Sequence, residues 1–203
     1  MTAETRRVTD GDMTDAEVLA ALEDSSAILR GHFQLTSGRH SDTYVQCARV
    51  LEDPALTTRL AEAMARRSAP FEIDLVAAPA VGGIIIGFAV AQALGVRFIF
   101  SEREQGAMRF RRAFDVPEGA RVLVVEDVVT TGGSVAEVVR LVEEAQARAV
   151  AVTSIIDRGG PKAFDVPLHP LLRLEVESWE PSECGLCASE VPLYSPGSRR
   201  TGK

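Results

Sequence analysis

Two acidic residues, Glu126 and Asp127, end an apolar run and stand directly before a loop of threonine, glycine and serine. The loop, residues 130–134, is followed by a stretch with valines at helical spacing. Ahead of a helix, such a loop offers free backbone N–H groups to an anion, and the helix dipole favours negative charge there. Carboxylates beside a bound phosphate accept hydrogen bonds from sugar hydroxyls or bind Mg²⁺, directly or through water. The segment therefore predicts a site for a sugar phosphate; the alternative is a solvated acidic turn before an ordinary helix cap.

The elements that must position this site alternate between strands and helices. Strands are predicted at residues 73–78, 96–101, 121–127, 148–157 and, as a shorter one, 172–179. Helices are predicted at residues 54–67, 82–94 and 135–142, and a first helical period runs from residue 14 to Leu29. This alternation predicts an α/β fold with a doubly wound, mostly parallel sheet, in which ligands bind outside the carboxyl ends of the strands. Loops at residues 78–83, 126–134 and 157–160 should therefore meet at one site.

The predicted domain covers residues 14–180, after a disordered tail at residues 1–13. A small N-terminal hood is expected at about residues 30–50, where alternating segments are typical of a short hairpin. Residues 102–118 are charged and contain a glycine, which predicts a mobile loop or an exposed hairpin. Residues 181–203 are rich in proline, serine and glycine, and they predict a flexible C-terminal tail.

Composition and charge limit the function classes. The chain has 203 residues and a net charge of −7, which argues against a broad nucleic-acid-binding face. Residues 75–96 are nearly all apolar, but Pro79 and several glycines interrupt them, so a buried strand, turn and helix explains them better than a membrane span. The three cysteines and the absence of an apolar leader favour a reducing compartment, the cytoplasm.

Residues 122–134, VLVVEDVVTTGGS, resemble the phosphoribosyl-diphosphate-binding signature of the type I phosphoribosyltransferases. The resemblance implies a Mg²⁺-assisted transfer of ribose 5-phosphate to a nitrogenous base, with release of diphosphate. It implies that Glu126 and Asp127 hold the ribose hydroxyls, act in catalysis and bind Mg²⁺, directly or through water. The implied phosphate cradle consists of Val128, Val129, Thr130, Thr131, Gly132, Gly133 and Ser134.

Two further segments, residues 31–54 and SIIDRGG at residues 154–160, are similar to the orotate phosphoribosyltransferases. In that family the arginine of the second segment, Arg158 here, pairs with the orotate carboxylate. A planar guanidinium matches a carboxylate bidentately, and a surface ion pair at a strand end is the alternative. The resemblance also places Thr130, Tyr44 and Val45 against the base. It implies a homodimer that binds orotate and phosphoribosyl diphosphate, with the mobile loop shared between subunits.

The sequence departs from that family where lysines are usual. Position 36 is threonine, position 82 is glycine, and residues 101–114 contain arginines but no lysine. Diphosphate contacts are therefore expected from the backbone of Val81 and Gly82 and from the side chains of Arg103 and Arg109. Arg103 is expected to stabilise charge during catalysis, since arginine hardly deprotonates. Two alternatives stay open: transfer to a purine or to uracil, and a regulator on the same fold that senses phosphoribosyl diphosphate.

Cys184 and Cys187 form a C-x-x-C pair, which is a spacing typical of metal ligands. His169 and Cys47 are candidate further ligands for a zinc ion, and two such pairs across a dimer would supply four sulfurs. A reduced pair without metal is the alternative.

Overall fold

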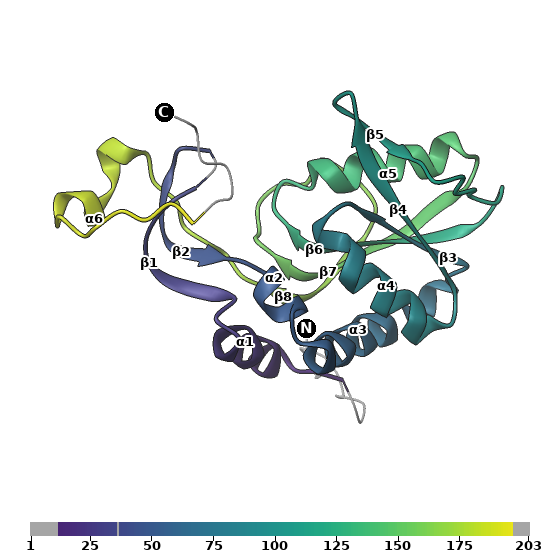
Figure 1. Ribbon diagram of the computed structural model, residues 1–203, viewed down its shortest axis with the longest axis horizontal. Coiled ribbons are helices and arrows are strands. Elements are labelled where there is room, and N and C mark those ends of the chain that lie inside the picture. Colours follow the sequence, from purple (N-terminus) through teal and green to yellow (C-terminus); the bar gives the residue numbers. More distant parts are fainter. Residues whose placement is uncertain (1–11, 36, 197–203) are drawn as a thin grey trace, which may run out of the picture.

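The computed structural model describes residues 12–35 and 37–196 (Figure 1). Residues 1–11, Thr36 and residues 197–203 lie outside the described residues, and with them most of the predicted N-terminal tail and the end of the C-terminal tail. Within the described chain, no helix is both long and apolar enough to cross a membrane.

A six-stranded sheet forms the centre of the molecule, in the order β5-β4-β3-β6-β7-β8. Neighbouring strands are parallel except for the antiparallel pair β4–β5, which confirms the mostly parallel α/β fold. The strands are β3 (Leu75–Pro79), β4 (Arg97–Glu104), β5 (Ala107–Phe110), β6 (Arg121–Val129), β7 (Arg148–Asp157) and β8 (Leu168–Arg173). The exposed-hairpin alternative for the charged segment is the one that the structure shows, since β4 and β5 form it.

Helices cover both faces of this sheet (Figure 1). One core joins alternate β6 residues, Leu123 and Val125, to apolar residues of α3 and α4. The other joins Val122 and Val124 to α5. Because both faces are covered, consecutive residues of the central strands are apolar, as in Val122–Val125 of β6. The helices are α1 (Asp15–Asp24), α2 (Ala48–Leu51), α3 (Pro54–Ser68), α4 (Gly82–Leu94) and α5 (Gly133–Glu144), with a short 3₁₀ helix η1 at Ala69–Phe71.

The first helix begins as its sequence predicts but ends earlier. Thr14 and Glu17 form a capping box at its start. The helix ends at Asp24, and Ser26 has a positive φ of 57°, which turns the chain out of the helical path. Leu29 therefore lies on a strand, β1 (Ile28–Gln34), and the prediction of a helical period up to that residue was wrong.

The predicted hood is an antiparallel hairpin of β1 and β2 (His40–Val45). The predicted strand at residues 172–179 is shifted, because β8 covers Leu168–Arg173 and contains Pro170. Proline lacks the N–H that a central strand needs, but β8 is an edge strand and tolerates it.

The C-terminal segment, which we define as residues 181–196, folds back on the hairpin (Figure 1). It contains a 3₁₀ helix η2 (Pro181–Glu183) and a short helix α6 (Gly185–Ala188). The Gln34 N–H donates to the Tyr194 carbonyl at 2.9 Å, and the Tyr194 N–H donates to the His32 carbonyl at 2.8 Å. This differs from the predicted flexible tail, because the hairpin edge supplies backbone partners that composition does not reveal.

Candidate active site

Two of the loops predicted to meet, after β3 and after β6, contact each other at Gly82 and Asp127. A Cβ atom added at Gly82 would lie 2.7 Å from Asp127 Oδ2 and 2.8 Å from Oδ1. Such a distance is shorter than non-bonded carbon and oxygen atoms tolerate, so this carboxylate position requires a glycine at residue 82. The Asp127 carboxylate therefore occupies the space that the side chain of the family's usual lysine would need.

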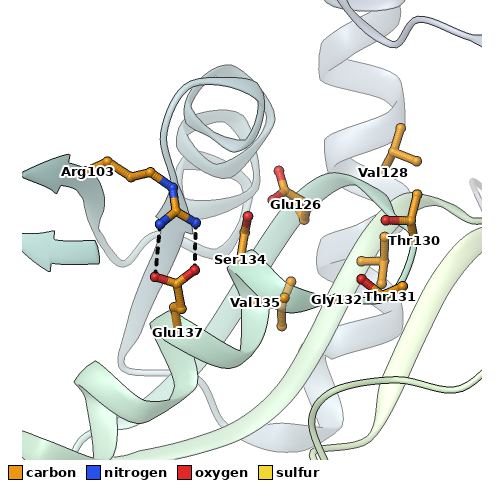
Figure 2. A pocket seen from close by; sticks show the side chains of 11 residues that line it. Arg103, Glu126, Val128, Thr130, Thr131, Gly132, Ser134, Val135 and Glu137 are labelled. Atoms are coloured by element: carbon orange, nitrogen blue, oxygen red, sulfur yellow. Dashed lines mark hydrogen bonds and ion pairs between the residues drawn. The ribbon is translucent and has the colours of Figure 1, made fainter. Parts of the chain in front are cut away.

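The predicted phosphate cradle lines a cavity of about 270 Å³ at the start of α5 (Figure 2). Gly132 precedes the helix with a φ of 75°, a conformation that favours glycine. The helix N-terminus presents its free N–H groups here. The predicted cradle residues that line the cavity are Val128, Val129, Thr130, Thr131, Gly132, Gly133 and Ser134, together with Glu126.

Arg103 lines the same cavity, and Glu137 of α5 holds its guanidinium (Figure 2). Arg103 Nη2 donates to Glu137 Oε1 at 2.6 Å, and Nη1 donates to Glu137 Oε2 at 3.2 Å. Arg109 lines neither this cavity nor the larger cavity described below, and its nearest ion-pair partner is Glu104, at 3.7 Å on β4. The structure thus brings Arg103 to the phosphate cradle of its own chain but does not bring Arg109 there.

The acid pair lies between the cradle and the Gly82 loop, and its charge is costly there. Burial, and then the neighbouring Asp127 carboxylate, raise the pKa of Glu126 to about 9. Burial also raises the pKa of Asp127, although the Val128 N–H donates to its Oδ1 at 2.7 Å. Among the described residues neither acid has an ion-pair partner. Their charged forms therefore gain most from a bound cation or from hydroxyl donors of a ligand.

A second, larger cavity of about 620 Å³ adjoins the cradle. All four residues predicted to contact the base line it: Thr130, Arg158, Tyr44 and Val45. Arg158 Nε is buried and has no hydrogen-bond partner in the described part of the chain. Burial lowers the pKa of this guanidinium. A buried donor without a partner is costly, so an anionic acceptor in this cavity would remove that cost.

Val128, Thr130 and Thr131 line both cavities, so the loop after β6 forms their common wall. A ligand of the cradle and a ligand of the larger cavity would therefore both contact this loop. Leu35 and Ser37 of the hood line the larger cavity, as does Ser178 of the segment after β8. Arg39 of the hairpin turn donates to Ser178 Oγ at 3.0 Å, which ties the hood to the segment after β8.

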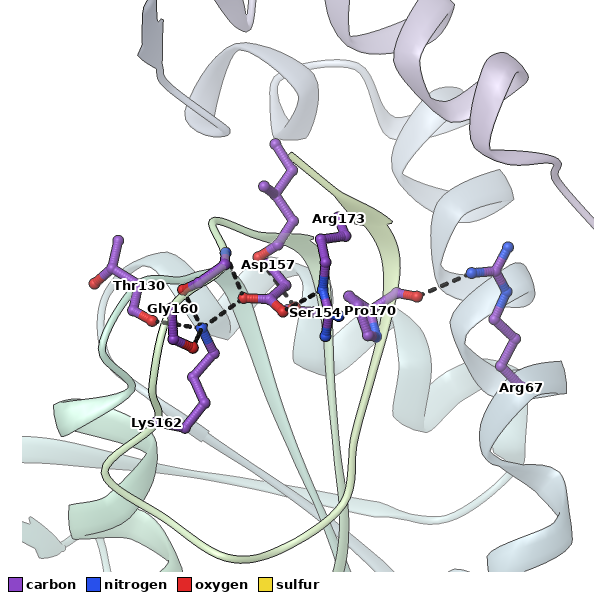
Figure 3. A network of polar contacts seen from close by, with 10 residues as sticks. Arg67, Thr130, Ser154, Asp157, Gly160, Lys162, Pro170 and Arg173 are labelled. Atoms are coloured by element: carbon purple, nitrogen blue, oxygen red, sulfur yellow. Dashed lines mark hydrogen bonds and ion pairs between the residues drawn. The ribbon is translucent and has the colours of Figure 1, made fainter. Parts of the chain in front are cut away.

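Lys162 connects the loop after β6 to the loop after β7 (Figure 3). Its role was not predicted from the sequence. Its Nζ donates to the Thr130 carbonyl at 2.9 Å and to the Gly159 carbonyl at 2.6 Å. It also pairs with Asp157 Oδ1 at 2.7 Å, while Arg173 Nε donates to Oδ2 of the same carboxylate at 3.1 Å. A lone lysine after a Gly-Gly-Pro turn was the only local signal, and it does not reveal which carbonyls the ammonium reaches.

The proton equilibrium of Asp157 reflects this network. Burial alone would raise the pKa of Asp157, but hydrogen bonds from Lys162, the Gly159 N–H and Arg173 lower it below its usual value. The charged carboxylate at the end of β7 is therefore stabilised by the residues that hold the two loops together.

Comparisons with known proteins agree with this architecture. Residues 48–167 match the model of the phosphoribosyl transferase domain family. The orotate phosphoribosyltransferase of Heliobacterium modesticaldum is 49% identical over 190 residues, which cover 92% of this chain and 100% of the relative. That of a Thermoanaerobacter species is 46% identical over 189 residues, which cover 93% of this chain and 100% of the relative. The crystal structure of orotate phosphoribosyltransferase from Aeropyrum pernix superposes with a TM-score of 0.68 at 25% identity, covering 78% of this chain and 94% of that one.

The parallel sheet, the cradle at the start of α5 and the acid pair before it define the phosphoribosyltransferase class, and the family model covers more than half of the chain. Within that class, the chain belongs to the orotate phosphoribosyltransferase family.

Proposed function

We propose that the protein transfers ribose 5-phosphate from phosphoribosyl diphosphate to orotate, giving orotidine 5′-phosphate and diphosphate in pyrimidine nucleotide biosynthesis. The observation that carries this proposal is the common wall of the two cavities. It separates a phosphate cradle from a cavity in which Arg158 Nε is buried without a partner. Orotate carries the carboxylate that this guanidinium lacks, whereas uracil does not.

The reaction needs positioning more than it needs a reactive side chain. The bond between the anomeric carbon and the diphosphate oxygen breaks, and a bond forms from that carbon to the orotate ring nitrogen. The carbon passes through an oxocarbenium-like state, as in other glycosyl transfers. The cradle holds the 5-phosphate, Glu126 and Asp127 hold the ribose hydroxyls, and Arg158 orients the base for attack.

The acid pair also fits Mg²⁺. Two adjacent carboxylates without a cationic partner in the described chain are hard oxygen donors of the kind that this ion prefers. We assign Glu126 and Asp127 to hold it, directly or through water. When bound, Mg²⁺ supplies neutralisation of the charge on the diphosphate.

Diphosphate would contact the backbone of Val81 and Gly82 and the guanidinium of Arg103. The ion pair between Arg103 and Glu137 keeps this guanidinium beside the cradle, so binding of diphosphate would exchange one anionic partner for another. Arg109 remains a proposed diphosphate contact only if the β4–β5 hairpin acts on a neighbouring subunit, since within its own chain it pairs with Glu104.

We further propose a homodimer. Three large apolar residues on the face of α4 and its preceding loop are exposed: Val81 at 81%, Ile85 at 52% and Phe88 at 59%. Contiguous exposed apolar side chains mark an interaction surface, and its position beside the Gly82 loop would place a second copy next to the site. The β4–β5 hairpin forms one edge of the sheet, and its turn projects from the body of the molecule (Figure 1). The three unpaired cysteines are in keeping with a cytoplasmic location.

The experiment that tests the proposed activity follows the ultraviolet absorbance of orotate in the presence of phosphoribosyl diphosphate and Mg²⁺. Loss of the orotate signal should require all three components and the enzyme. Reactions with uracil and with a purine serve as controls for the base. Turnover of a purine or uracil in place of orotate would contradict the assignment, and so would binding of phosphoribosyl diphosphate without turnover of any base.

A further inference from the structure

Four potential metal ligands from the two ends of the chain meet away from the active site. They are His32 and His40 of the hairpin and Cys184 and Cys187 of the C-terminal segment. One ligand atom from each lies within 4.8 Å of all the others. Neither Cys47 nor His169, the further ligands considered from the sequence, belongs to this group.

Four of the six distances between these atoms lie near the edge lengths of a metal-centred tetrahedron. With Zn–N bonds of about 2.0 Å and Zn–S bonds of about 2.3 Å, tetrahedral ligand atoms lie about 3.3 to 3.8 Å apart. His32 Nε2 lies 3.0 Å from His40 Nδ1, 3.4 Å from Cys184 Sγ and 3.7 Å from Cys187 Sγ. Cys187 Sγ lies 3.2 Å from His40 Nδ1. These separations differ from the ideal edges by a few tenths of an ångström.

A bound metal ion explains this arrangement better than hydrogen bonds among the four side chains do. His32 Nδ1 lies 2.8 Å from the Val191 carbonyl, which only accepts, so Nδ1 carries the proton. In the neutral ring, Nε2 then has a single lone pair, yet three polar atoms surround it. A metal ion uses that lone pair together with those of the other three groups. A ring nitrogen fixed by a backbone carbonyl on its far side is also the usual support of a metal-bound histidine.

The surroundings fit a closed structural site. His32, His40 and Cys184 are 3%, 4% and 3% exposed, and Cys187 lies on the outer side, where an ion can enter. Two neutral imidazoles and two thiolates around Zn²⁺ have no net charge, which suits a buried place. Four protein ligands leave no open position for a substrate, as in structural rather than catalytic zinc sites.

We propose that His32, His40, Cys184 and Cys187 bind one structural Zn²⁺ ion that fixes the C-terminal segment to the hood. Binding displaces the two thiol protons to solvent and forms two Zn–S and two Zn–N bonds. The hairpin strand that carries His40 also carries Tyr44 and Val45, which line the base cavity. The ion therefore stabilises one wall of that cavity without contacting it.

The test measures metal in the purified full chain, made without a histidine tag, so that its outcome does not depend on the proposed activity. We expect about one zinc ion per chain by elemental mass spectrometry. Replacement of zinc by Co²⁺ should give the sulfur-to-metal charge-transfer and tetrahedral ligand-field bands of a site with two thiolates. Less than about 0.1 zinc per chain, after reduced protein is incubated with Zn²⁺ and passed through a desalting column, would overturn the proposal.

Variants locate the ion. The double variant C184S/C187S and the variant His32→Gln should lose the zinc and show a lower melting temperature, whereas Cys47→Ser should keep one zinc per chain. Cys47 is the matched control, since it is the remaining cysteine and is not part of the cluster. Full retention of zinc in the double variant would place the ion elsewhere and contradict the assignment. The cobalt spectrum of the wild-type chain keeps the test decisive if a variant does not fold.

Discussion

The Asp127 carboxylate lies directly against the backbone of Gly82, so that a Cβ at residue 82 would be 2.7 Å from Oδ2. This contact joins the loop after β3 to the acid pair at the end of β6. It means that the proposed diphosphate loop and the proposed ribose-binding acids hold each other in position. The position of the Asp127 carboxylate therefore leaves no room for the lysine that the family usually has at position 82.

The first prediction concerns Gly82→Ala. The added methyl group must displace Asp127, and a displacement of about 1 Å at a reacting centre costs roughly a hundredfold in rate. We expect kcat/KM for orotate to fall by about that factor, with little change in melting temperature. The matched control is Gly185→Ala, because a Cβ at Gly185 meets no atom within 4 Å and the residue lines neither of the two cavities. Equal activities of the two variants would show that the contact has no functional role.

Lys162→Met should separate the two loops that the ammonium connects. We expect the KM for orotate to rise roughly tenfold, because the loop bearing Arg158 is no longer fixed to the Thr130 carbonyl. The turnover number should change less than the KM. Arg173→Met is the comparison, since Arg173 pairs with the same Asp157 carboxylate, whereas the Thr130 and Gly159 carbonyls are bonded by Lys162. If both variants raise the KM equally, Lys162 acts only through Asp157 and not through the loops.

The low pKa of Asp157 predicts an acid-dependent stability. A carboxylate whose pKa is lower in the folded chain stabilises the fold above its unfolded value, about 3.9, and this contribution is lost as the pH falls through the folded value. Asp157→Asn should therefore reduce the free energy of unfolding at pH 7 by about 3 kcal/mol, the usual effect of breaking a buried pair. Urea titrations of both proteins at pH 7 and near pH 3 would measure the difference. A gap that is the same at both pH values would contradict the assigned pKa shift.

Phe88→Asp should dissociate the proposed homodimer. The exposed apolar surface at Val81, Ile85 and Phe88 would then carry a charge at its centre, which an apolar interface does not tolerate. Sedimentation velocity should show twice the chain mass for the wild type and the single chain mass for the variant. Leu193→Asp is the control, because Leu193 is a similarly exposed apolar residue on the C-terminal segment. A monomeric wild-type chain would refute the dimer and leave Arg109 without a proposed role.

Much of the fold could be predicted from the sequence because its signals are local. Strand β7 occupies the predicted residues, Arg148–Asp157, since its apolar run ends at a charged residue and a Gly-Gly turn. Periodicity was misleading at Leu29, where a single left-handed residue, Ser26, outweighs three turns of helical pattern. The strand predicted at residues 172–179 was misplaced, since β8 begins at Leu168 and contains Pro170, which an edge strand tolerates.

The site could be predicted only where one segment carries its chemistry. The acid pair and its cradle are continuous in sequence, and all four residues predicted to contact the base line one cavity. The contacts of Lys162 with Thr130 and of His32 with Cys184 join residues 32 and 152 positions apart. No local pattern specifies such pairs, since they depend on how the sheet order and the folded-back C-terminal segment bring the chain together.

The central claim, that Arg158 selects orotate by its carboxylate, is tested most directly by comparing orotate with uracil. The measurement is kcat/KM for each base in the wild-type enzyme and in Arg158→Met, with Arg140→Met on the outer side of α5 as the control. Losing one partner of a buried charged hydrogen bond costs about 2–5 kcal/mol, which is at least a thirtyfold loss for orotate. We predict that the wild type and Arg140→Met prefer orotate strongly and that Arg158→Met loses this preference. An unchanged ratio of orotate to uracil in Arg158→Met would contradict the assignment of the base cavity.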